Sequence, residues 1–198
     1  RGDFLSRIKK EAVRMTSLID DILMISRLET GGIQAELREM STEELVREAV
    51  SSVEGMARER RIEIETDTEE FYICADRRQM EELFTNLLSN GVKYNLDGGK
   101  IWLSLKRRGK IMELQVRDTG VGIPKESVGR IFERFYRVDK GRSRKQGGTG
   151  LGLSIVKHIV NFYHGTVTVS SSQAEDSHGT VFIVRLPVAR EARKNSRV

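Results

Sequence analysis

The segment from residue 77 to residue 94 constrains the fold most, because its two faces differ in chemistry. Apolar side chains recur there at the three- and four-residue spacing of an α-helix, at Met80, Leu83, Phe84, Leu87 and Leu88. Such a stripe predicts a helix that packs one side against a sheet. The polar face carries Asn86, Asn90 and Lys93 at positions i, i+4 and i+7, so two amides and an ammonium stand in a row.

Other periodicities predict both helices and strands along the rest of the chain. Helical patterns cover residues 41–59 and begin again at 152, and strand-like runs cover 61–66, 71–75, 100–106, 110–117, 165–170 and 179–186. Arg108-Gly109 predicts a hairpin turn, and the last two runs are expected to pair in the same way. The regular β-α alternation of a doubly wound sheet is missing, which favours an α+β fold. We predict a two-layer α/β sandwich in which helices cover one face of a mixed sheet.

The N-terminal 30 residues show a separate apolar pattern with alternating steps of four and three. Its members are Phe4, Ile8, Met15, Leu18, Ile22 and Ile25. This pattern predicts one long bundle helix ahead of the sandwich, and its exposed stripe should seek a partner helix. Gly31 and Gly32 end that helix, so we expect residues 1–30 as helix, 31–37 as linker, 38–187 as the folded domain and 188–198 as a basic C-terminal tail.

Composition narrows the function classes. The net charge is +5, from 34 Lys and Arg against 29 Asp and Glu, and much of the excess falls in residues 137–145. No run of aromatic residues or reading helix accompanies it, so we expect no nucleic-acid partner; phosphate on a small ligand explains the cluster equally well. Cys74 is the single cysteine, which rules out an internal disulfide. The sequence has neither a signal peptide nor an apolar run of about 18 residues, so we expect a cytoplasmic segment that does not itself enter a membrane.

Two glycine-rich motifs offer ligand chemistry. In Asp118-Thr119-Gly120-Val121-Gly122 the carboxylate can accept a hydrogen bond from an exocyclic amine, and the glycines let backbone approach a flat ring. Residues 147–153 lead directly into a helix, where free amides and the helix dipole favour an anion. Taken singly, each motif has an ordinary alternative: a capped turn, a flexible loop with a helix cap and, for residues 77–94, a solvated helix face.

Four motifs in fixed order identify the family. Asn86-x-x-x-Asn90, Asp118-x-Gly-x-Gly, the segment 131–137 (IFERFYR) and the segment 148–153 (GTGLGL) resemble the N, G1, F and G2 boxes of sensor histidine kinases. The resemblance covers residues 38–187 as a catalytic and ATP-binding domain. Residues 1–30 resemble the second helix of the dimerisation and phosphotransfer hairpin, with the first helix absent.

The resemblance implies the Bergerat ATP-binding fold, with ATP and Mg²⁺ as ligands. Asp118 would bind the adenine amino group, Gly120 and Gly122 would line the base together with Ile123, and Tyr94 would lie near the ribose. Asn86 would hold Mg²⁺, and Asn90 and Lys93 would reach phosphates. The triphosphate would be cradled by Gly148, Thr149, Gly150, Leu151, Gly152 and Leu153.

The F box would supply the catalytic group and the lid. Arg137 would stabilise charge on the γ-phosphate as the phosphoryl group leaves. Phe132 and Phe135 are expected to pack and dock the lid, which residues 140–145 would form. Glu82 stands one turn before Asn86, where related ATPases place a base, and we expect it to be an exposed helical residue instead.

The implied function is transfer of the γ-phosphoryl group of ATP to a histidine outside this sequence, for relay to an aspartate of a response regulator. The parent kinase would be a homodimer through the bundle helix and a membrane protein of which this is a cytoplasmic portion. His158, His164 and His178 lack the His-Glu-x-Arg-x-Pro setting of the family's phosphoacceptor, so this chain alone is not expected to phosphorylate itself, and all three are assigned structural or surface roles.

Three alternatives remain open at this point. The chain can be another Bergerat ATPase or serine kinase, such as an anti-sigma kinase, a topoisomerase subunit or a heat-shock chaperone. It can also be a regulatory ATP-binding module without catalysis, or an interaction fragment that only dimerises.

Overall fold

The computed structural model describes residues 35–138 and 149–187, together with Ile8, Ala12, Met15, Thr16, Ile19 and Leu23. These six N-terminal residues are helical and exposed, in agreement with the predicted helix. The other members of the predicted stripe, Phe4, Leu18, Ile22 and Ile25, lie outside the described residues. Within the described part of the chain, no helix has the length and apolar character needed to cross a membrane.

A five-stranded mixed sheet forms one layer of the fold, in the order β2-β4-β5-β7-β6. Its strands are β2 (Glu63–Thr68), β4 (Lys100–Arg108), β5 (Ile111–Asp118), β6 (Thr166–Ser172) and β7 (Gly179–Pro187). β2 runs parallel to β4, and the other neighbours are antiparallel. β1 (Leu37–Ser41) and β3 (Tyr72–Asp76) form a separate two-stranded antiparallel sheet.

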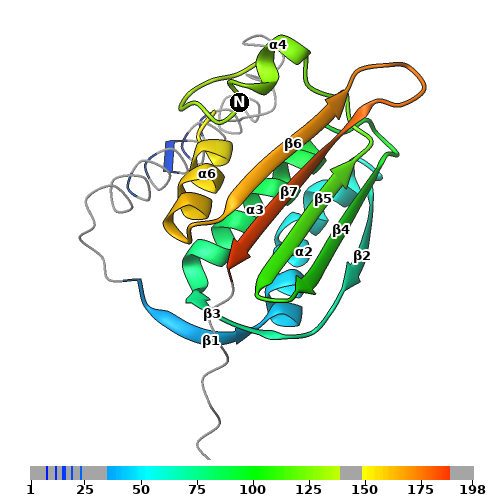
Figure 1. The fold of residues 1–198 in the computed structure, drawn as a ribbon. Helices are drawn as coiled ribbons and strands as arrows, with labels where there is room; N and C mark the ends of the chain where they lie inside the picture. The colour runs from blue at the N-terminus through cyan, green and yellow to red at the C-terminus, as the bar shows by residue number, and fades with distance from the viewer. Residues whose placement is uncertain are drawn as a thin grey trace, which may run out of the picture.

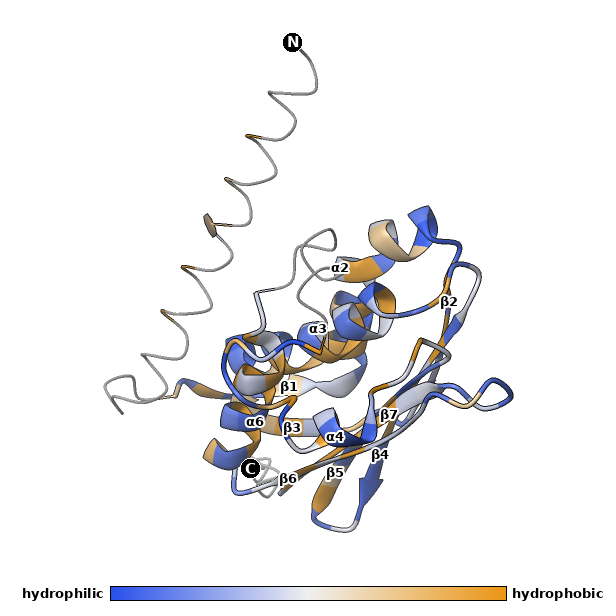
Figure 2. Ribbon diagram, turned by 90° about the horizontal axis from the view of Figure 1, so that it is seen from above, coloured by the Kyte–Doolittle hydropathy of each residue, from blue (hydrophilic) through white to orange (hydrophobic). Residues whose placement is uncertain are grey.

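Three helices form the second layer: α2 (Thr42–Glu59), α3 (Arg77–Lys93) and α6 (Gly152–Phe162). Figure 1 shows them on one face of the five-stranded sheet, and the view from above in Figure 2 shows the same two layers. The short helix α4 (Lys125–Val128) follows β5. The predicted two-layer α+β sandwich is therefore confirmed.

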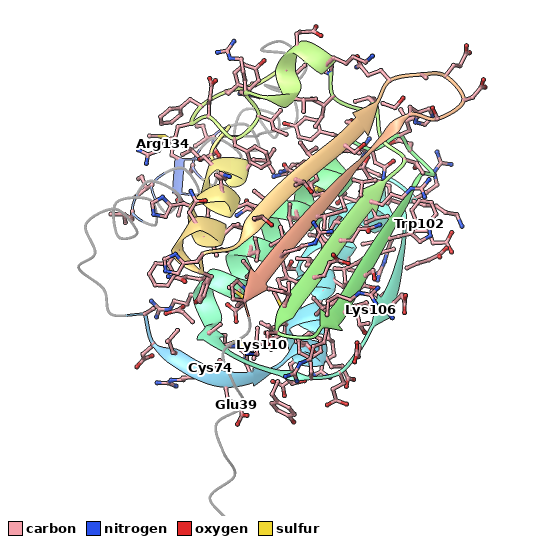
Figure 3. The ribbon with its side chains drawn as sticks, in the orientation of Figure 1. Glu39, Cys74, Trp102, Lys106, Lys110 and Arg134 are labelled. Carbon is pink, nitrogen blue, oxygen red and sulfur yellow. The ribbon has the colours of Figure 1, made fainter. Side chains whose placement is uncertain are left out.

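The core lies between the two layers. α3 is its centre, because Leu83, Phe84, Leu87 and Leu88 have no exposed surface. Alternate residues of β4 and β5 point into the same core, and their neighbours point to the face without helices. On that outer face Trp102 and Lys106 lie toward β2, where they contact Glu65 and Asp67 (Figure 3).

Local sequence explains the main boundaries. Asp76 is the N-cap of α3, and its carboxylate caps the helix by accepting a hydrogen bond from Gln79 N. Gly109 has a positive φ of 62° in the predicted β4–β5 turn. Two elements were not predicted. β1 has little apolar alternation, and α4 is only four residues long.

Candidate functional site

The Asp118 carboxylate is buried at the end of β5, with only 8% of the residue exposed. Its Oδ1 accepts hydrogen bonds from Gly120 N at 2.8 Å and Thr180 N at 3.2 Å. Burial raises the pKa of this carboxyl to about 6, and the two backbone hydrogen bonds and the charge of His178 only partly offset that rise. The Asp118 carboxylate is thus a hydrogen-bond acceptor that two backbone N–H groups hold in position. Its buried surroundings make an unpaired charge unfavourable.

The loop after Asp118 lies against the end of α3. Val121 N donates to the carbonyl oxygen of Tyr94 at 3.1 Å. A β-carbon at Gly120 would clash with that same carbonyl group, so only glycine allows this approach. Tyr94 itself is 40% exposed. Gly91, one turn earlier on α3, faces Asp118, with 3.9 Å between a β-carbon built on the glycine and the aspartate Cβ.

A buried amide network fixes the same end of α3. Asn95 is 3% exposed, and its Oδ1 accepts hydrogen bonds from Leu96 N and from the Thr119 hydroxyl. Its Nδ2 donates to the carbonyl oxygen of Lys100 at 3.1 Å. Lys100 N in turn donates to the Thr119 hydroxyl at 2.9 Å. The network ties α3, β4 and the residue next to Asp118 together.

Arg60 closes the carboxyl end of α3 from the other side. Its guanidinium donates to the carbonyl oxygens of Val92, Lys93 and Asn95, and pairs with Asp97 at 3.0 Å. A cation here satisfies carbonyls that a helix end leaves unpaired and complements the helix dipole. The sequence analysis identified neither Asn95 nor Arg60, because both act through contacts distant in sequence.

The other end of the α3 polar face meets the start of α6. Asn86 Nδ2 donates to the backbone oxygen of Glu82 at 2.9 Å and to its carboxylate at 3.2 Å. Asn86 Oδ1 faces Gly152, where a built β-carbon would lie 2.5 Å away. Glu82 is exposed, as predicted, although it holds the Asn86 amide. The geometry orients Asn86 with its oxygen toward α6.

The start of α6 has exposed hydrogen-bonding capacity. Leu151 occupies the N-cap position without any side-chain cap, and it is fully buried. Thr149 Oγ1 accepts from Leu151 N at 3.3 Å, and Gly150 takes a positive φ of 77°. Leu153 and Ile123 are half-buried and pack on the core. The helix amides that follow Leu151 are therefore available to an anion.

The F-box phenylalanines differ from each other, which corrects part of the prediction. Phe132 is half-buried and packs edge-on against Phe182, with ring centroids 6.4 Å apart, so its predicted packing role is confirmed. Phe135 is 59% exposed and has a φ of 61°, so the prediction that it packs is wrong. Its N–H donates to the carbonyl oxygen of Gly150 at 2.9 Å. That bond, and not burial, links Phe135 to the loop before α6.

Arg137 is partly buried, with Nε and Nη2 lacking any hydrogen-bond partner in the structure. Two buried N–H donors without a partner favour an anionic ligand. No described contact joins Arg137 to Asn86 or Asp118. Gly148 and the predicted lid residues 140–145 lie outside the described residues.

The sites of the separate motifs thus meet along one helix. Asn86 lies against the start of α6, Gly91 lies against Asp118 at the end of β5, and Tyr94 accepts a hydrogen bond from the loop after β5. Asn90 and Lys93 are half-buried on the same helix and lie between Asn86 and Tyr94 in the sequence. Within residues 35–138 and 149–187 no cluster of three or more His, Cys, Asp or Glu side chains could hold a metal. Asn86 Oδ1 is the hard oxygen donor that the site itself offers to Mg²⁺.

Comparison with protein families gives one match over residues 75–190, to the family described as histidine kinase-, DNA gyrase B-, and HSP90-like ATPase. Sensor-like histidine kinase SenX3 of Mycolicibacterium smegmatis is 35% identical over 185 residues, which are 93% of this chain and 48% of the relative. Sensor protein kinase WalK of Staphylococcus saprophyticus is 33% identical over 93% of this chain and 30% of its own length. The chain spans about half the length of SenX3.

Solved structures agree with the sequence relatives. ShkA in complex with AMPPNP matches 96% of this chain and 39% of its own, with a TM-score of 0.82 and 26% identity. The mycobacterial sensor histidine kinase MprB matches 78% of this chain and 99% of its own, with a TM-score of 0.67 and 27% identity. Histidine kinase ThkA in complex with the response regulator TrrA matches 94% and 51%, with a TM-score of 0.70 and 26% identity.

Proposed function

The chain belongs to the family of histidine kinase-, DNA gyrase B- and HSP90-like ATPases and carries the ATP-binding catalytic portion of a sensor histidine kinase. We propose the following roles for its residues in phosphoryl transfer. It transfers the γ-phosphoryl group of ATP to a histidine other than its own three. The observation that carries the proposal is the meeting of the motifs along α3, with Asp118 at one contact and the start of α6 at the other.

Asp118 accepts a hydrogen bond from the adenine amino group. The buried carboxylate already receives two backbone N–H groups on Oδ1, which hold its plane in one orientation. Gly120, Gly122 and Ile123 form the adjoining wall, and Tyr94 lies beside the base and ribose. A charge-assisted hydrogen bond to a buried carboxylate favours a base with an amino group at that position over a base with a carbonyl oxygen there.

Asn86, Asn90 and Lys93 hold the phosphate side. Asn86 donates its amide hydrogens to Glu82, so its Oδ1 remains the ligand for Mg²⁺. Bound Mg²⁺ supplies charge neutralisation at the phosphate oxygens. Gly148 to Leu153 cradle the triphosphate, with the open amides of Gly152 and Leu153 at the start of α6, and Asn90 and Lys93 contact phosphate oxygens. ShkA, which matches this fold, was solved in complex with AMPPNP, and this supports a nucleotide as the ligand.

Arg137 is the proposed catalytic residue. Nε and Nη2 of its guanidinium are buried without a hydrogen-bond partner, and a cation with open donors can bind the γ-phosphate as negative charge shifts toward the bridging oxygen. Positioning and charge stabilisation are the main contributions that a protein makes to phosphoryl transfer.

The partners follow from the same family. A response regulator receives the phosphoryl group on an aspartate, as the ThkA complex with TrrA supports. In the parent kinase the N-terminal helix dimerises through its apolar stripe, of which the two described members, Ile8 and Met15, are exposed. The parent is a membrane protein and this portion is cytoplasmic.

Incubation of this chain with labelled ATP, Mg²⁺ and a separately produced hairpin domain bearing the acceptor histidine tests the proposal. We expect acid-labile label on that histidine in the wild type and much less in Asp118→Asn. Asp67→Asn is the matched control, because it makes the same change at an exposed position on β2, paired with Lys106. Hydrolysis of ATP without transfer to the hairpin would instead identify a general ATPase.

A further inference from the structure

Several residues of the β6–β7 hairpin contact Asp118 and the loop that follows it. Ser171 Oγ accepts from Ile123 N at 2.8 Å and donates to the carbonyl oxygen of Gly179 at 2.8 Å. Thr180 N donates to Asp118 Oδ1. Gln173 Nε2 reaches the carbonyl oxygen of Val121 at 3.5 Å. The loop is therefore supported by a hairpin that lies about 50 to 60 residues later in the sequence.

His178 contacts Gly120, the residue whose N–H donates to the Asp118 carboxylate. Its Nδ1 lies 2.9 Å from the carbonyl oxygen of Gly120. A carbonyl oxygen only accepts, so Nδ1 must carry the hydrogen in this contact. The imidazole is half-buried, and its charge acts on the Asp118 carboxylate. His178 thus holds the Gly120 backbone, which lies next to the proposed adenine ligand Asp118.

We propose that His178 is a positioning residue for the nucleotide base: by donating from Nδ1 to Gly120, it holds the Asp118–Gly120 backbone in the conformation that binds adenine. This inference rests on the proposed function. Without the donor, the Gly120 carbonyl group loses its partner among the described residues, while the bonds of Gly120 N, Val121 N and Ile123 N remain. This part of the loop must then be ordered further when ATP binds. Ordering on binding reduces affinity.

Isothermal titration of the 198-residue chain with Mg-ATP tests the role of His178. His178→Ala should bind ATP about fivefold to tenfold more weakly, because the partly buried hydrogen bond to Gly120 is lost. His178→Phe, which keeps a ring but has no donor, should show the same loss. His178→Asn should recover affinity to within about twofold, since its amide nitrogen occupies a position similar to Nδ1. Glu175→Ala, at an exposed position in the turn of the same hairpin, is the control and should bind as the wild type does.

The outcomes separate the two proposals. Wild-type affinity in both His178→Ala and His178→Phe would overturn the positioning role while leaving the ATP site intact. Equal weakening in His178→Asn would overturn it too, because the donor would not be what matters. A wild-type chain that binds no ATP would overturn the proposed function, and the inference with it. The variant melting temperatures identify any loss that comes from unfolding, and His178→Asn then decides the question.

Discussion

Asn86 Oδ1 on α3 lies against Gly152, the first residue of α6, with no room between them for a β-carbon. The contact joins two motifs that are far apart in the chain and orients the amide oxygen toward the helix start. The proposed Mg²⁺ ligand and the proposed phosphate-binding amides therefore depend on one close approach, and glycine is required there for space.

Gly152→Ala should reduce phosphoryl transfer tenfold or more, because the new methyl group would lie 2.5 Å from Asn86 Oδ1 and must displace it. The free energy of unfolding should change by less than about 1 kcal/mol, since the displaced group is the end of a side chain. Gly55→Ala is the control: nothing lies within 4 Å of its added methyl group, and the helix should gain about 0.5 to 1 kcal/mol. Transfer at the wild-type rate by Gly152→Ala would remove Asn86 from the metal site.

Asp118→Asn should weaken ATP binding by on the order of 1.5 to 3 kcal/mol, because a charge-assisted bond at a buried position is lost. Its Oδ1 can still accept from Gly120 and Thr180, so the loop should keep its conformation. Calorimetric titration with Mg-ATP measures the change, and Asp67→Asn should bind normally. Unchanged affinity in Asp118→Asn would exclude this residue from base recognition.

The pH dependence of stability should carry the signature of Asp118. The pKa of its carboxyl rises from 3.8 to about 6 on folding, so between these values the folded chain keeps a proton that the unfolded chain has lost. The stabilisation from this group is complete below about pH 4 and is lost as the pH rises through about 6. Asp118→Asn has no such loss.

Thermal unfolding at two pH values measures this effect. The free energy of unfolding of Asp118→Asn minus that of the wild type should be larger at pH 7.5 than at pH 4, by on the order of 1 to 3 kcal/mol. Greater stability together with weaker nucleotide binding is expected where a functional site retains a buried charge. A difference that does not change with pH would mean that the carboxyl titrates normally.

The two F-box phenylalanines should respond differently to truncation. Phe132→Ala should reduce the free energy of unfolding by about 1 to 3 kcal/mol, because the ring packs on Phe182 and the core. Phe135→Ala should change it by less than about 0.5 kcal/mol, since the ring is 59% exposed. Chemical denaturation compares them, and equal losses would contradict the packing described here.

The helices and strands that pack on the core could be predicted from the sequence, because their apolar residues recur at helix or strand spacing. α3 was expected over 77–94 and spans Arg77–Lys93, and the β4–β5 hairpin turns at Gly109 as expected. The parallel pairing of β2 with β4 and the small β1–β3 sheet were not predicted, because strand partners are chosen by packing of distant segments. A strand such as β1, with three exposed residues, carries little pattern of its own.

The site was predicted to a similar extent. Asn86, Asp118, Gly120 and Gly152 stand in recognisable motifs, and the structure brings them to one helix. Phe135 was misassigned because apolar character predicts burial, whereas its left-handed backbone leaves the ring exposed. Thr180, His178, Asn95 and Arg60 support the site through contacts that no local pattern reveals.

The most direct measurement is a titration of the isotope-labelled chain with Mg-ATP, followed through its backbone amide resonances. We expect saturable shifts at Asn86, Asp118, Gly120 and Gly152, whereas Ser104 and Lys106 on the outer face of the sheet should not shift. Saturable shifts confined to other parts of the chain, or none at millimolar ATP, would contradict a nucleotide site along α3.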